Sequence, residues 1–170
     1  MEFVELAELR QRDWDAVVAG EHQPFGSVGA ELAWRLKERH FALREQDGRL
    51  LALAALVSVE VEVEGAGDLD VVGLGGVIVT PCERGRGLMF KVVEPVLALA
   101  EEMGPERAML FCRPALVAVY RRLGFEEIAA PVWADQPAGP VAMPMRAMWR
   151  ALRAGAEWPP GRVHVRGLPF

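Results

Sequence analysis

Polar and apolar residues alternate strictly along 57–63, the pattern of a β-strand with one buried and one solvated face. The alternation is the second half of a longer apolar run, Leu50–Glu64, which an Asp-Gly pair precedes and a turn over Gly65–Asp68 follows. Asp-Gly is a strong hairpin signal. The pattern therefore predicts an antiparallel block of three strands over His40–Arg44, Leu50–Glu64 and Asp70–Thr80.

Helical spacing and turn residues predict the elements on either side of this block. Before it we expect a strand over Phe3–Leu9, a helix over Asp13–Ala19, a loop over Gly20–Gly26, and a helix over Val28–Glu38 capped by Ser27. After it we expect a helix over Leu88–Met103, a strand over Arg107–Cys112, a helix over Pro114–Leu123, and closing strands over Phe125–Trp133 and Val141–Trp149. The order of elements indicates an α/β fold, with a mixed sheet that is parallel at its centre.

Length and composition restrict the classes of protein. A chain of 170 residues forms one core of ordinary size. No apolar stretch reaches the length of a membrane span, and the acidic start MEFVELAEL is unlike a signal peptide, so we expect a cytoplasmic protein. Cys82 and Cys112 form no disulfide framework. The net charge of −5 argues against nucleic acid and is compatible with a cationic substrate.

Candidate chemistry lies in the turn Arg84-Gly85-Arg86-Gly87, between a predicted strand and a predicted helix. Backbone N–H groups at the positive end of a helix dipole can bind a diphosphate, and flanking arginines add charge-assisted hydrogen bonds. Surface turns of this composition are also common, so the tetrapeptide alone decides nothing. No Gly-Lys-Ser/Thr follows, which excludes a P-loop, and G-x-G-x-x-G is absent.

Two segments together are more specific. V-x-P-x-x-R-G-x-G-L over Val79–Leu88, followed by Y-x-x-L-G-F over Tyr120–Phe125, resembles the signature segments of the GNAT acetyltransferases. The resemblance implies the GNAT fold, a twisted and splayed mixed β-sheet with flanking helices, and acetyl-CoA as co-substrate without a metal. It also implies a coenzyme site in which the turn binds the pyrophosphate and the strand before it pairs with the pantetheine arm. The residues assigned to that site are Val77, Ile78, Val79, Arg84, Gly85, Arg86, Gly87, Leu88 and Met89.

The resemblance further implies direct transfer of an acetyl group to an amine, in which Tyr120 protonates the departing thiolate. The family pattern usually has Gly or Ala where Met89 stands and often an asparagine near Arg113, so this chain departs from it at both positions. The general base is not identified. Glu60, on the polar face of the alternating strand, is a candidate remote base or simply a solvated residue.

Substrate contacts are predicted at two places. His22, in the loop Gly20–Gly26, is a candidate substrate or base residue, and otherwise an exposed imidazole. We divide the chain into a GNAT domain, 1–150, and a tail, 151–170. The tail contains Trp-Pro-Pro-Gly and ends in apolar residues, so we expect it to fold back onto the domain. One hypothesis places the Phe170 carboxylate near a cationic substrate; the other makes the tail a strand that caps the sheet or contacts a second subunit.

Three functions stay open. A small-molecule N-acetyltransferase is favoured, and a non-catalytic acyl-CoA-binding module and a protein or peptide acetyltransferase are the alternatives. A homodimer is left open, and no nucleic-acid or membrane partner is expected. The segment Trp158–Val163 has a faint similarity to the end of aminoglycoside 2′-N-acetyltransferases, which carry an acidic residue where this chain has Gly75.

Overall fold

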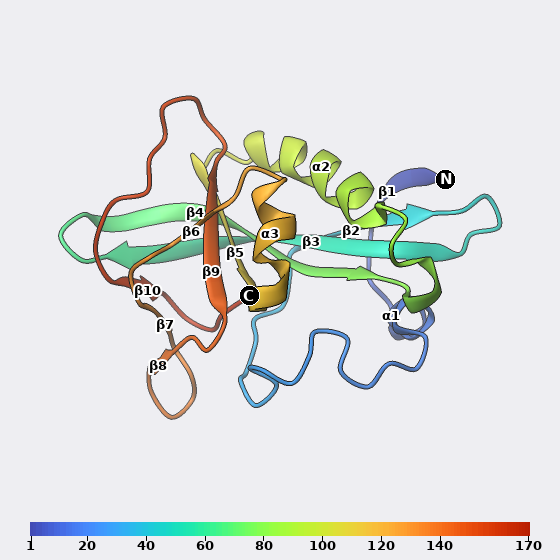
Figure 1. Cartoon of the computed structure of the whole chain (residues 1–170), viewed down its shortest axis with the longest axis horizontal. Helices are drawn as coiled ribbons and strands as arrows, with labels where there is room; N and C mark the ends of the chain where they lie inside the picture. The colour runs from blue at the N-terminus through green and yellow to red at the C-terminus, as the bar shows by residue number, and fades with distance from the viewer.

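The computed structural model describes residues 1–170, which form one mixed sheet of ten strands with three α-helices (Figure 1). The elements are β1 (Glu2–Leu6), α1 (Gln11–Val18), β2 (Arg39–Arg44), β3 (Leu50–Val63), β4 (Gly67–Val79), α2 (Leu88–Glu101), β5 (Arg107–Cys112), α3 (Val117–Arg121), β6 (Glu126–Glu127), β7 (Val132–Ala134), β8 (Val141–Ala142), β9 (Arg146–Ala151) and β10 (Val163–Val165). The sheet runs β6-β9-β5-β4-β3-β10-β7-β8, and β2 and β1 extend it from β3. The structure has no helix whose length and apolar content suffice for a membrane crossing.

The long antiparallel pair β3–β4 forms the middle of the sheet and separates two layers. Helix α2 lies along one face, while α1 and the connection from α1 to β2 lie along the other (Figure 1). In the middle of β3 the even-numbered residues Ala52, Ala54 and Leu56 join the core under α2. Leu53, between them, faces the other layer, where it packs with Val17 of α1. The alternation in the sequence thus determines which layer each side chain enters.

Strand β4 carries a bulge that changes its direction. Leu53 pairs with Ile78 and Ala55 pairs with Gly75, so Ala54 alone stands opposite Gly76 and Val77. Gly76 has φ +60, a conformation that a glycine adopts without strain. The extra residue reverses the alternation, so that Leu74 and Val77 face the α2 layer and Ile78 faces α1.

Strands β4 and β5 are parallel neighbours for a short distance only. Their register extends over Val72–Ala108 and Gly73–Met109, and the two strands part beyond that point. The bulge at Gly76 lies in this diverging stretch of β4. An opening with unpaired main-chain groups therefore forms at the centre of the sheet, as the resemblance implied.

The predicted helix over Val28–Glu38 is wrong. This segment is a chain of turns and extended residues that leads into β2. Leu36, an apolar residue of the predicted helix, is 90% exposed, whereas Ala33 and Trp34 are half-buried. The segment is held instead by the N–H of Arg35, which donates to the carbonyl of Pro169, and by the side-chain amide of Gln136, which bonds both main-chain groups of Ala33.

The two closing strands are also shorter than predicted. Phe125–Trp133 divides into β6 and β7, and Val141–Trp149 divides into β8 and β9. Pro131 and Pro144 lie in the interruptions, because proline lacks the N–H that a strand ladder needs. The helix expected over Pro114–Leu123 is a 3₁₀ turn, Pro114–Leu116, followed by α3.

The last residues of the chain return to the sheet. Strand β10 pairs antiparallel with β3 and parallel with β7. It lies on the same edge of β3 as β2, next to the second half of β3, whereas β2 pairs with the first half. Asp135 fixes this return, since its carboxylate accepts hydrogen bonds from the N–H of Gly167 (2.7 Å) and from the ring of His164 (2.7 Å). These bonds lower the pKa of the Asp135 carboxyl.

Candidate functional site

A mostly apolar cavity lies at the opening between β4 and β5 and has a volume of about 540 Å³. Residues from both layers line it, among them Tyr120 and Leu116 on the α2 side and Phe170 and His40 on the other. The cavity therefore passes through the sheet. A mostly apolar channel with a few polar groups is typical of a ligand site.

The glycine-rich turn adjoins the end of β4, as the sequence indicated. Gly85 and Gly87 have φ +76 and +72, and no heavy atom lies within 4 Å of a Cβ built on either, so the turn is open to a ligand. Gly87 is the N-cap of α2. The N–H groups of Gly85, Arg86 and Gly87 donate no hydrogen bond to another protein group. Free N–H groups at the start of a 14-residue helix suit a diphosphate.

Both arginines of this turn are already paired with carboxylates. Arg84 forms a two-bond ion pair with Glu21, and its Nε donates to the carbonyl of Val79 at 3.1 Å. Arg86 pairs with the buried Glu83. Arg84 therefore ties the glycine-rich turn to the loop Gly20–Gly26, which forms a wall of the cavity. That connection was not visible in the sequence.

Tyr120 lines the cavity from α3, and its ring packs edge-on against Phe125. Its hydroxyl makes no hydrogen bond to another protein group. Burial, and to a lesser degree the nearby Cys112, raises the pKa of Tyr120. The hydroxyl thus stays protonated across the physiological range and is free to donate a hydrogen bond into the cavity.

Cys112, at the end of β5, also lines the cavity, but its environment does not favour nucleophilic chemistry. Burial and the nearby Glu127 raise the pKa of its thiol to about 11, against a smaller opposite effect of Arg146. A thiol with a raised pKa contains little thiolate at neutral pH. A covalent acyl-cysteine step is therefore disfavoured.

One cation of the cavity, Lys37, was not indicated by any sequence pattern. Lys37 lies over β4, and a Cβ on Gly75 would stand 2.5 Å from its Cε atom. Its Nζ donates to the carbonyl of Arg35 at 3.3 Å. The predicted helix hid this placement, because the turns that replace it bring Lys37 to the bulge.

The other predicted site residues are divided between the cavity and its surroundings. His22 lines the cavity wall and is exposed, and the ring of Phe170 lies 5.2 Å from that of Phe111 inside it. Val77 lines the cavity, whereas Ile78 turns into the core beside α1. Leu88 is buried in the core under α2, and Met89 packs against that core.

Glu60 lies outside the cavity, on the exposed face of β3 close to the tail, where its carbonyl accepts a hydrogen bond from the N–H of Arg166. The structure thus does not bring it together with Tyr120. No aspartate or glutamate lines the cavity.

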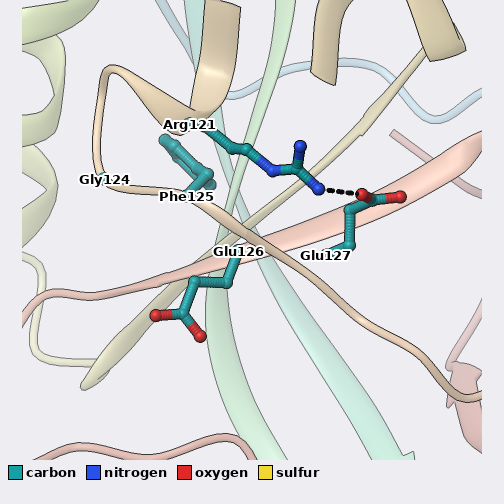
Figure 2. A pocket seen from close by; sticks show the side chains of 5 residues that line it. All are labelled: Arg121, Gly124, Phe125, Glu126 and Glu127. Atoms are coloured by element: carbon teal, nitrogen blue, oxygen red, sulfur yellow. Dashed lines mark hydrogen bonds and ion pairs between the residues drawn. The ribbon is translucent and has the colours of Figure 1, made fainter. Parts of the chain in front are cut away.

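A second, open pocket lies at the end of α3. Its five lining residues include Arg121 and Glu127, which form an ion pair at 2.6 Å (Figure 2). Glu126 points away from this pair (Figure 2). Arg121 and Glu127 are thus paired with each other, and Glu126 is the charged group of this pocket that forms no ion pair. No group of three or more His, Cys, Asp or Glu side chains gathers where it could hold a metal ion.

Known proteins resemble this chain in sequence and in fold. The family model of the acetyltransferase (GNAT) domain matches residues 6–128. A rice protein (Oryza sativa subsp. japonica) named as a probable glucosamine 6-phosphate N-acetyltransferase is 33% identical over 108 residues. That match covers 61% of this chain and 63% of the rice protein, so the chain spans less than two thirds of its curated relative.

Solved structures establish the fold. A GNAT family N-acetyltransferase from Escherichia coli in complex with CoA has a TM-score of 0.60 at 22% identity, covering 95% of this chain and 88% of that one. An N-acetyltransferase structure from Lactobacillus plantarum has a TM-score of 0.60 at 15% identity, with 89% and 98% covered. The similarity to aminoglycoside 2′-N-acetyltransferases at the carboxy-terminal end stays a prediction. The family model covers most of the chain, and the chain belongs to the GNAT acetyltransferase family.

Proposed function

We propose that this protein transfers an acetyl group from acetyl-CoA directly to the primary amine of a small molecule. The observation that carries the proposal is the cavity through the sheet, with the unbonded Tyr120 hydroxyl on its wall and the open Gly85–Gly87 turn beside it. The cavity supplies a place for a reactive arm and an acceptor together, and membership of the GNAT family supports this use of it.

The residues suit the coenzyme as follows. The free N–H groups of the turn, with Arg84 and Arg86, would bind the pyrophosphate, and the main chain of Val77–Val79 would pair with the pantetheine arm in the gap between β4 and β5. When bound, acetyl-CoA supplies an acyl group activated as a thioester. The main chain at the bulge would polarise the acyl carbonyl through an N–H group.

Tyr120 would act at the other end of the reaction. The neutral acceptor nitrogen forms the new C–N bond, the C–S bond breaks, and the phenol hydroxyl provides the proton for sulfur. The proton that the nitrogen loses on becoming an amide restores the phenol. The acceptor ammonium must first lose a proton. No aspartate or glutamate side chain lines the cavity to receive it, which leaves the imidazoles of His22 and His40, the carboxylate of Phe170, and solvent.

The walls of the cavity favour a small acceptor over a protein or peptide. Glu21–Arg84 fastens the loop Gly20–Gly26 to the coenzyme turn, and Gln136 fastens the segment around Ala33. Both contacts hold segments at the cavity wall in place, where an extended peptide would have to enter. A non-catalytic acyl-CoA-binding module remains the second candidate, because no aspartate or glutamate side chain lines the cavity as a base.

A panel assay tests the proposal. Purified protein is incubated with acetyl-CoA and single amines, including glucosamine 6-phosphate, glucosamine, amino acids and a lysine peptide, and thiol release and product mass are recorded. We expect a small amine to gain one acetyl group with equal release of thiol. Tight binding of acetyl-CoA without transfer to any amine would favour the non-catalytic module, and acetylation of the peptide alone would favour the protein acetyltransferase.

A further inference from the structure

Lys37 brings a primary amine of the chain itself into the cavity. Its side chain lies over Gly75, where a built Cβ would stand 2.5 Å from Cε and 3.4 Å from Nζ. Gly75 is the last residue of β4 before the bulge, and it lines the cavity together with Lys37, Gly76 and Val77. The amine is thus held beside the part of β4 where, under the proposed function, the main chain polarises the acyl carbonyl.

The amine of Lys37 and the phenol of Tyr120 enter the cavity from opposite faces of the sheet. Lys37 lies on the face of β4 where the ring of Phe170 packs over Gly73, whereas Tyr120 belongs to the core under α2. Both side chains line the same cavity. A nucleophilic nitrogen on one side of a thioester and a proton donor on the other suit direct transfer.

Charges of both signs lie near this amine and have opposite effects on it. Burial, and then the charge of Arg35, lower the pKa of Lys37 to about 8. The carboxyl carbon of Phe170 lies 3.4 Å from the same Cβ position on Gly75, and a negative charge there favours the ammonium form. The burial of the side chain makes neutral Nζ available at weakly alkaline pH, and an amine must be neutral to attack a carbonyl.

The remaining charged groups around Lys37 are bonded elsewhere or neutral. The carboxylate of Glu38 accepts hydrogen bonds from the N–H and hydroxyl of Ser58. Burial, and then the charge of Lys37, lower the pKa of His40, so its imidazole is neutral where Lys37 titrates. Nζ itself donates one hydrogen bond, to the carbonyl of Arg35 at 3.3 Å, which a neutral amine can also donate. Its lone pair then remains for the cavity.

We propose that Lys37 is itself an acceptor, and that the acetyl group of acetyl-CoA bound in the cavity is transferred to its Nζ. The inference rests on the proposed function for the binding of acetyl-CoA. The neutral Nζ forms a bond to the thioester carbonyl carbon, the C–S bond breaks, and Tyr120 gives its proton to sulfur. The nitrogen loses one proton on becoming an amide, and that proton restores the phenol. The products are free CoA and one acetyl-lysine.

This modification changes the cavity. It removes the positive charge over Gly75 and adds an amide at the place where a small acceptor would bind. A small amine in the cavity competes with Lys37 for the same acyl group. Self-acetylation is therefore expected when acetyl-CoA is present without an acceptor, and an accepted amine should slow it.

Mass spectrometry of the intact chain and its fragments tests the inference. The chain has two lysines, and the other one, Lys91, lies exposed on α2. The protein is incubated with acetyl-CoA alone at about pH 8.5, where an amine with a lowered pKa is largely neutral, and cleavage after glutamate then separates the lysines on 32–38 and 84–94. We expect Lys37 to be acetylated at least about tenfold faster than Lys91, because a positioned amine has a high effective concentration. Equal or slower labelling of Lys37 overturns the inference.

Two controls separate transfer within the cavity from ordinary amine reactivity. Tyr120→Phe should slow the labelling of Lys37 by about tenfold or more and leave that of Lys91 unchanged. Acetyl phosphate, which offers an acetyl group without a pantetheine arm, should show no preference for the half-buried Lys37 over the exposed Lys91. The same preference with acetyl phosphate, or unchanged labelling in Tyr120→Phe, contradicts transfer from the bound thioester.

The outcomes also distinguish this inference from the proposed function. Acetylation of a small amine, with Lys37 unlabelled when that amine is left out, rejects the inference and keeps the function. Labelling of Lys37, with no amine of the panel acetylated, keeps the inference and rejects the small-molecule function. A melting temperature that acetyl-CoA does not change rejects both.

Discussion

Lys37 occupies the space that a side chain on Gly75 would need. A Cβ at Gly75 would stand 2.5 Å from Lys37 Cε, so the two positions cannot both carry side chains in this arrangement. Lys37 comes from the turns before β2 and Gly75 from the strand that leads into the bulge. The absence of a side chain on β4 is therefore what lets a cation enter the middle of the cavity.

Gly75→Ala should displace Lys37 and weaken the acceptor site. The contact is with a flexible side chain, so we expect the fold to survive with a loss of about 1 kcal/mol. The KM for the acceptor should rise about tenfold, while the Kd for acetyl-CoA, measured by calorimetry, stays within a few-fold. An unchanged acceptor KM would show that the position of Lys37 is irrelevant to binding.

The coenzyme turn is tested by its arginines. Acetyl-CoA at a hundredfold excess over Kd should raise the melting temperature by several degrees. Arg84→Ala combined with Arg86→Ala should abolish most of that rise, because both guanidinium groups lie at the open turn. Glu21→Gln is the control, as it frees Arg84 and should preserve the rise. A parent-like response of the double variant would refute the pyrophosphate assignment.

Tyr120→Phe separates catalysis from packing. The hydroxyl makes no hydrogen bond within the protein, so the variant should keep its stability and its coenzyme affinity within a few-fold. Turnover should fall by roughly 10²–10⁴-fold, the range of general acid catalysis. Affinity that falls while single-turnover rates barely change would assign Tyr120 a packing role only.

Phe170 supports the cavity from the tail. Its side chain is 4% exposed and packs on Gly73 and Phe111, so Phe170→Ala should cost about 3 kcal/mol in the free energy of unfolding, measured with urea. Leu36→Ala is the control, since Leu36 is 90% exposed and its loss should change little. Truncation after Arg162 removes β10 as well, and we expect it to unfold the protein. A cost below about 1 kcal/mol for Phe170→Ala would show that the tail is not part of the core.

The pH dependence of stability reports on Lys37. Its pKa is lowered from 10.5 to about 8 by burial and by Arg35, so the unfolded chain binds the proton more tightly than the folded one. Through this group, stability rises with pH between about 8 and 10.5 and is lowest below 8. His40 faces Lys37 from β2, but its pKa is lowered from 6.5, so it titrates below this window.

Melting curves of the protein and of Lys37→Met from pH 7 to 10.5 measure this contribution. The parent should gain stability relative to the variant as the pH rises. Parallel curves would mean that the folded-state pKa of Lys37 is ordinary.

Local patterns were sufficient for the central sheet and the glycine-rich turn before α2. Alternation along Leu50–Glu64 predicted β3 to within a residue, and Arg107–Cys112 predicted β5. The Gly85–Gly87 turn was recognisable because its positive φ angles and its position before a helix demand glycine. In these places a short stretch of residues carries its own structural preference, and tertiary contacts agree with it.

Only the tertiary structure determined the conformation of Val28–Glu38 and the residues that it brings to the cavity. The spacing of apolar residues over Val28–Glu38 is that of a helix, but hydrogen bonds to Pro169 and Gln136 hold the segment as turns. Those bonds join residues more than a hundred positions apart, so no local pattern contains them. The same contacts place Lys37 over Gly75. The sequence alone identified the glycine-rich turn that we propose for the coenzyme, whereas the placement of Lys37 over Gly75 depended on distant segments meeting at the bulge of β4.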